Sequence, residues 1–162
     1  MNRSSTLVLG IGNTLLTDEG VGVHVIIRLA EKHAGMPGVT FLDGGTLSFS
    51  LAGQLASHDQ LIVVDAAYSG KSPGSVVCYE QEDMEKYMKG NRKSVHEVGL
   101  GDLLDMARLA GHYPGRCALI GIEPFSMEWG ETLSPVVEGS VSTAMDAVLR
   151  LLNRWHKAPL NS

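Results

Sequence analysis

Residues 7–23 are Leu7-Val-Leu-Gly-Ile-Gly-Asn-Thr-Leu-Leu-Thr-Asp-Glu-Gly-Val-Gly-Val23. The run begins as a buried strand, bends at Gly10, Gly12 and Asn13, and places two acids, Asp18 and Glu19, where a helix is about to start. Carboxylates at the mouth of a strand–loop–helix unit lie among backbone donors and near the positive end of the helix. The stretch therefore predicts such a unit, with a loop suited to metal or proton chemistry.

The glycine spacing also resembles that of a nucleotide-binding loop. A dinucleotide fingerprint needs a third glycine three residues after the second, where this chain has Leu15. The next glycine, Gly20, follows two acids, which would repel a pyrophosphate. No Gly-Lys-Ser/Thr of a P-loop follows this loop either. A nucleotide site is therefore disfavoured, and measurable NAD or ATP binding would be needed to support one.

Composition restricts the class of protein. At 162 residues the chain is expected to form a single domain over residues 1–162. Its net charge of −5 and lack of a basic patch argue against a nucleic-acid partner. Two isolated cysteines, with no signal peptide and no apolar run of about 18 residues, predict a cytoplasmic protein without a membrane partner. We expect a monomer.

Short apolar runs alternate with segments of helical periodicity. This alternation predicts an α/β fold, a three-layer αβα sandwich around a mostly parallel twisted sheet. Ser134 is a candidate cap and Pro135 a candidate first residue for the last helix, which has the clearest period. The predicted strands buried on both faces are 7–11, 39–42, 61–64 and 117–122, with a weaker, possible edge strand at 75–79. The predicted helices are 20–32, 48–57, 97–110 and 135–155.

Three acids are predicted at the sheet edge where parallel strands end and where α/β proteins bind their ligands. Asp65 ends one strand, Asp43 ends another before Gly44 and Gly45, and Glu19 lies in the loop after the first strand. A single acid there is usually a loop or capping residue. Three acids on one edge favour a carboxylate-rich site for Ni, Zn, Mn or Fe(II).

A charged segment, 81–94, interrupts the regular alternation. It is either a solvated connection with a short helix or a mobile flap beside the site. The run Ser94-Val-His-Glu97 that ends it is a capping box, which places His96 in the first turn of a helix. The positive helix end there favours neutral, metal-ligating imidazole over imidazolium.

Common hydrolase motifs are missing. The chain has no His-Glu-x-x-His zincin motif. Its one Gly-x-Ser-x-Gly sequence, at 70–74, precedes the predicted strand 75–79 and not a helix, so it is not a nucleophile elbow. Cys78 and Cys117 lie in or beside strands with no apparent histidine activator, which favours structural roles. The other histidines are scattered, and Asp18 is a second ligand, a helix-end charge or a solvated acid.

At these residues the chain resembles the hydrogenase maturation proteases, endopeptidases that trim the C-terminus of the large subunit of [NiFe] hydrogenases. The resemblance runs in order from about residue 7 to residue 155. It rests on Gly-Ile-Gly-Asn-Thr-Leu-Leu-Thr-Asp-Glu-Gly-Val-Gly (10–22), Leu-Asp-Gly-Gly-Thr (42–46), Val-Val-Asp-Ala (63–66) and Ser-Val-His-Glu-Val-Gly-Leu (94–100), with Leu-Ile-Gly-Ile-Glu-Pro (119–124) and Leu-Ser-Pro (133–135).

The resemblance implies an αβα fold in which Glu19, Asp65 and His96 bind nickel that arrives in the precursor of the hydrogenase large subunit, the partner protein. Another divalent metal would be able to replace nickel in the isolated protein. Three ligands are too few to hold nickel against competitors, but they can complete the coordination of a metal presented by a partner. Precursor without nickel would lack this contact and would escape cleavage.

The hydrolytic step has two possible mechanisms. Either the metal polarises the scissile carbonyl or activates water, or a carboxylate acts as general base in an aspartyl-type reaction. Asp43 is the candidate base, although a plain tight turn would use the same Asp-Gly-Gly residues. A non-proteolytic nickel-sensing chaperone of the large subunit is the alternative function, because the same residues would serve it.

Overall fold

Five strands form one sheet in the order β2-β1-β3-β5-β4 in a computed structural model that describes residues 5–90 and 95–157. Strands β1 (Thr6–Ile11), β2 (Val39–Gly45), β3 (Gln60–Ala66) and β5 (Arg116–Ile122) are parallel, and β4 (Val76–Glu80) is antiparallel to β5. The ends of the four parallel strands form what we call the carboxyl edge of the sheet.

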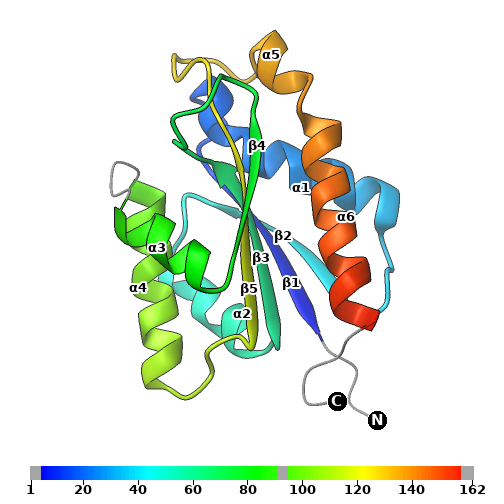
Figure 1. Cartoon of the computed structure of the whole chain (residues 1–162), viewed down its shortest axis with the longest axis vertical. Helices are drawn as coiled ribbons and strands as arrows, with labels where there is room; N and C mark the ends of the chain where they lie inside the picture. Colours follow the sequence, from blue (N-terminus) through cyan, green and yellow to red (C-terminus); the bar gives the residue numbers. More distant parts are fainter. Residues whose placement is uncertain (1–4, 91–94, 158–162) are drawn as a thin grey trace.

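Helices cover both faces of the sheet, as Figure 1 shows. One face packs against α1 (Val21–His33), α5 (Pro135–Glu138) and α6 (Val141–Lys157), and we call it the α1/α6 face. The other packs against α2 (Ala52–Ala56), α3 (Glu82–Gly90) and α4 (Val95–Leu109), and we call it the α4 face. Two 3-10 turns, η1 (Thr17–Gly20) and η2 (Phe49–Leu51), precede α1 and α2. The predicted three-layer αβα sandwich is confirmed.

Side-chain alternation along the strands divides the core into two clusters. In β3, Ile62 and Val64 enter the α1/α6 face, whereas Leu61 and Val63 enter the α4 face. The strands β1, β3 and β5 are buried along nearly their whole length, as predicted from their continuous apolar runs. The predicted burial of 39–42 on both faces is wrong, because β2 is an edge strand and is only partly covered.

Two predicted helices differ from the structure. The segment 135–155 is broken between α5 and α6, because Gly139 is a poor helix former and the Ser140 hydroxyl donates to the carbonyl of Gly74. The segment 48–57 begins with the short turn η2 before α2. The weak strand predicted at 75–79 is confirmed as the edge strand β4. No helix in the described part of the chain is long and apolar enough to cross a membrane.

Candidate active site

The glycines of the first loop allow close backbone packing. A Cβ at Gly12, where φ is +140°, would lie 2.1 Å from the carbonyl oxygen of Glu19, and one at Gly22 would lie 2.0 Å from that of Val64. A Cβ at Gly10 would lie 2.4 Å from the Gly22 carbonyl oxygen. Only glycine fits at these positions. The loop therefore presses η1 and the start of α1 against β1 and β3.

Glu19 occupies η1 at this edge and is largely buried, with 8% of its surface exposed. The backbone N–H of Asn13 donates a hydrogen bond of 2.6 Å to its Oε2 atom. Since η1 also contacts β3, the fold brings Glu19 to the strand that carries Asp65. The bend between β1 and α1 thus fixes both the backbone and the carboxylate of Glu19.

Asp65 is the penultimate residue of β3 and is only 2% exposed. The backbone N–H of Ala66 donates to its Oδ1 atom at 2.8 Å. Alternation with Leu61 and Val63 directs its side chain to the α4 face. A buried carboxylate is costly unless hydrogen bonds, cations or a metal compensate it. Two such acids, Glu19 and Asp65, therefore mark this part of the carboxyl edge.

His96 lies in the first turn of α4, as the capping-box pattern predicts. Its side chain, together with residues 91–94 and the predicted cap Ser94, falls outside the residues that the structure describes. The chain passes from α4 into the start of the parallel strand β5, so the N-terminal turn of α4 lies toward the carboxyl edge (Figure 1). The backbone thus places His96 above the face that Asp65 enters.

Among the described side chains, no three His, Cys, Asp or Glu residues are grouped closely enough to hold a metal ion. The predicted ligand set of Glu19, Asp65 and His96 contains one side chain outside that search. Two carboxylates and an imidazole supply the O and N donors that nickel accepts. The residues present therefore suit nickel carried by a substrate.

Asp43 lies on a different part of the edge. It pairs in register with Gly10, its side chain is exposed, and its Oδ1 atom accepts the backbone N–H of Gly45 at 2.9 Å. Because β2 and β3 are separated by β1, their backbones are about 10 Å apart. Alternation with Phe41 directs Asp43 to the α1/α6 face, opposite to Asp65. The strands thus do not place Asp43 beside Asp65.

Asp18 is a buried anchor. Its carboxylate accepts hydrogen bonds from the N–H groups of Phe125 at 2.9 Å and Ser126 at 2.8 Å, and from the N–H at 2.8 Å and hydroxyl at 2.7 Å of Ser134. Burial raises its pKa, but these hydrogen bonds outweigh burial and hold the pKa below its ordinary value. Asp18 therefore ties η1 to the loop between β5 and α5.

Ser134 is the residue before α5 but does not cap it through its side chain. It occupies the predicted position, with Pro135 at the start of the helix, yet its hydroxyl makes no cap hydrogen bond and donates to Asp18 instead. Ser134 therefore lies at the predicted cap position, but its side chain hydrogen-bonds to Asp18 and not to the helix.

Glu123 is a fourth acid at the carboxyl edge that the predicted site did not include. It follows β5 directly, is 9% exposed, and accepts the N–H and hydroxyl of Ser69, both at 2.8 Å. This contact ties the loop after β3 to the end of β5. Its position immediately after an apolar strand is the same signal that singled out Asp65.

Residues 82–90 form the helix α3, which confirms the short helix predicted within a largely solvated connection. Met84 of α3 is buried on the α4 face, and the Tyr87 ring stacks on Tyr79 with centroids 4.7 Å apart. The Tyr87 hydroxyl accepts the N–H of Tyr68, in the loop after β3, at 2.9 Å. This part of the predicted flap therefore supports the chain that follows Asp65, and residues 91–94 lie outside the described residues.

The cysteines provide no activated nucleophile. Cys117 is buried in β5, and burial raises the pKa of its thiol to about 12. Cys78 is exposed on the edge strand β4, and partial burial together with nearby Glu80 raises its pKa as well. Both thiols are therefore protonated at neutral pH, in accord with their predicted structural roles.

Comparison with known proteins identifies the family. The model of the family described as hydrogenase maturation protease matches residues 23–151. The chain is 38% identical over 147 residues to the hydrogenase 2 maturation protease of Escherichia coli, covering 90% of this chain and 89% of that protein. It is also 38% identical over 150 residues to the hydrogenase expression/formation protein HupD of Rhizobium leguminosarum, covering 92% of this chain and 74% of that one.

Solved structures agree in fold. The hydrogenase-maturating endopeptidase HybD of E. coli superposes with a TM-score of 0.87 at 36% identity, covering 93% of each chain. The [NiFe] hydrogenase maturation protease HybD of Thermococcus kodakarensis superposes with a TM-score of 0.78 at 29% identity, covering 91% of this chain and 98% of that one. The chain is therefore a hydrolase that belongs to the hydrogenase maturation protease family.

Proposed function

We propose that this protein is the endopeptidase that removes the C-terminal extension from the precursor of a [NiFe] hydrogenase large subunit, and that it recognises the nickel in that precursor. Membership of the family supports the protease over the non-proteolytic chaperone. The observation that carries the nickel proposal is the burial of two acids, Glu19 and Asp65, at one edge of the sheet beneath the helix turn that holds His96.

Burial of the two acids gives the site its selectivity. Opposite charges attract more strongly in a site shielded from water, so a divalent nickel presented by the precursor would be held beside Glu19 and Asp65. The α4 N-terminus favours the neutral imidazole that a metal needs. The positive metal and the two carboxylates together make nickel-loaded precursor the preferred partner.

The ligands of this chain are proposed to complete the coordination of nickel already held by the precursor. A site that contributes only part of the coordination sphere binds free metal weakly but gains affinity when the partner supplies the rest. Precursor without nickel lacks this contact, and the difference in affinity becomes a difference in cleavage. Nickel is therefore part of the substrate, and the three residues act as its detector.

Asp43 is proposed to act on the peptide and not on the metal. Its exposed carboxylate lies two strands from Asp65. This separation suits a peptide that lies along the carboxyl edge, with the nickel-binding part of the precursor at Asp65. As general base, Asp43 would take a proton from the attacking water, whose oxygen would add to the scissile carbonyl. The C–N bond would then break, and Asp43 would pass the proton to the leaving amine. Positioning of the peptide by the metal contact lowers the barrier further.

The test uses the purified protein and one precursor in nickel-loaded and nickel-free forms, with the precursor mass followed over time. We expect a shortened product from the loaded form and little or none from the free form. Binding of the loaded precursor without any loss of mass would identify a chaperone and overturn the protease. Equal cleavage of both forms would overturn nickel recognition and leave the protease.

A further inference from the structure

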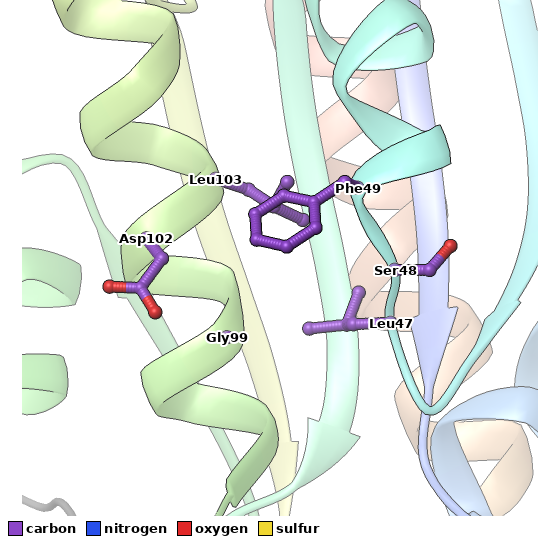
Figure 2. Close-up of a pocket in the computed structure, with 6 residues that line it drawn as sticks. All are labelled: Leu47, Ser48, Phe49, Gly99, Asp102 and Leu103. Atoms are coloured by element: carbon purple, nitrogen blue, oxygen red, sulfur yellow. The ribbon is translucent and has the colours of Figure 1, made fainter.

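A small pocket opens between the loop after β2 and the helix α4, as Figure 2 shows. Its volume is about 160 Å³, whereas pockets for small organic ligands hold about 300–1,000 Å³. The size therefore matches a single side chain of a partner and not a cofactor. The lining residues are Leu47, Ser48, Phe49, Gly99, Asp102 and Leu103.

Both walls of the pocket continue into the proposed site. On one wall, the N–H of Leu47 donates to the carbonyl of Gly44 at 3.1 Å, and Gly44 follows Asp43 directly. On the other wall, Gly99 lies three residues after His96 in α4, which is about one helical turn. A peptide that lies along the carboxyl edge between the end of β2 and the start of α4 would therefore pass the mouth of this pocket.

The backbone on the β2 side is held in a costly conformation. Leu47 has a φ of 58°, in the left-handed region that branched apolar residues rarely adopt. Such strain persists where the surrounding structure imposes it and is concentrated at ligand-binding sites. Here it places Leu47 opposite Gly99, whose added Cβ would lie 3.6 Å from the Leu47 Cδ1 atom.

The lining determines what the pocket accepts. Leu103 is buried and forms apolar surface next to Leu47, while Phe49 keeps 74% of its surface exposed at the pocket. Covering Phe49 with apolar atoms removes this surface from water. Among the lining residues that the structure describes, only Asp102 is charged, and its carboxylate would repel an acidic side chain. The apolar walls therefore favour an apolar side chain, and the Asp102 carboxylate disfavours an acidic one.

We propose that this pocket binds one apolar side chain of the precursor, in the extended segment beside the scissile bond. The proposal rests on the proposed protease function and adds a determinant of sequence specificity to it. Phe49 and Leu47 contact the bound side chain, and Gly99 leaves the space that it fills. The metal contact then reports that the precursor is loaded, while the pocket fixes which residue of the precursor lies at the cut.

The experiment measures kcat/KM on precursors in which each residue flanking the cut is replaced in turn by Ala, Asp and Lys. Gly99→Leu fills the pocket, Phe49→Ala removes an exposed wall without disturbing the core, and Ala110→Leu adds the same leucine to an exposed site beyond α4. Wild-type protein should lose about tenfold or more at one apolar position when that residue becomes Ala. That preference should disappear in Gly99→Leu and weaken in Phe49→Ala, and persist in Ala110→Leu.

The outcomes separate the two proposals. If Gly99→Leu and Phe49→Ala keep the wild-type preference at every position, the pocket does not bind a precursor side chain. The proposed protease function would be unaffected. The two variants could instead lose a preference for Lys and keep every preference for apolar residues. That result would show that the pocket binds a basic side chain and would overturn the apolar assignment. Failure of wild-type protein to cut any loaded precursor would overturn the protease and the pocket together.

Discussion

The Asp18 carboxylate and Ser134 are joined by two hydrogen bonds, of 2.8 Å from the Ser134 N–H and 2.7 Å from its hydroxyl. This contact links residues far apart in the chain, and it fixes the turn that carries Glu19 against the loop before α5. Since Asp18 and Glu19 are adjacent, the buried anchor and the proposed nickel ligand share one short turn. The stability of that turn and the geometry of the site are therefore coupled.

Replacement of Asp18 by Asn should destabilise the protein. The amide cannot accept all four hydrogen bonds, and its NH₂ group would meet N–H donors. We expect the free energy of unfolding to fall by about 2–4 kcal/mol. Urea unfolding measures the change, and Glu131→Gln, at an exposed position in the same loop, is the matched control. Equal stability of the Asn variant and the control would contradict the anchor.

Asp18 should also make stability depend on pH. Its pKa in the folded protein lies below its ordinary value of 3.8, so its contribution is complete above about pH 4 and is lost as the pH falls through the folded pKa. The free energy of unfolding of the wild-type protein should therefore fall more steeply below pH 4 than that of Asp18→Asn. Parallel pH profiles of the two proteins would exclude this titration.

Two of the helical glycines, Gly22 and Gly53, should respond oppositely to alanine. A Cβ at Gly22 would meet the backbone carbonyl of Val64 at 2.0 Å, so Gly22→Ala must displace the start of α1. We expect a loss of about 1–3 kcal/mol and impaired cleavage, because Glu19 moves with that turn. Gly53 has nothing within 4 Å of its Cβ position, and Gly53→Ala should stabilise α2 by up to about 1 kcal/mol. Thermal unfolding and precursor cleavage test both variants.

Asp43→Asn should separate hydrolysis from nickel recognition. If Asp43 is the general base, the variant should lower kcat by about a hundredfold or more, while the loaded precursor still binds better than the free one. Single-turnover cleavage measures the first effect, and binding of the two precursor forms measures the second. Unimpaired cleavage by the folded variant would exclude Asp43 as the general base and leave it only the structural hydrogen bond with Gly45.

The strand pattern and the positions of the acids could be predicted from sequence because they depend on local composition. Continuous apolar runs predicted β1, β3 and β5 as buried strands, and an acid after such a run marked Asp65. Glu123 carries the same signal, because it directly follows the apolar run of β5. The capping box placed His96 in the first turn of a helix, and α4 begins at Val95.

Features that depend on distant contacts could not be predicted. The role of Asp18 depends on residues 125–134, which meet it only after the sheet has formed. The break before α6 requires the carbonyl of Gly74 to lie beside Ser140. The edge position of β2 follows from strand order, which local periodicity does not contain, and it explains why Asp43 is exposed and separated from Asp65.

The central claim, that Glu19, Asp65 and His96 read the nickel in the precursor, is tested most directly by one rate ratio. The rate of cleavage of nickel-loaded precursor is divided by that of nickel-free precursor, for wild-type protein and for Glu19→Gln, Asp65→Asn and His96→Gln. We predict a large ratio for the wild-type protein and a ratio near one for each variant, because cleavage of the loaded form falls to the rate of the free form. Full-rate, nickel-dependent cleavage by folded His96→Gln would contradict the claim.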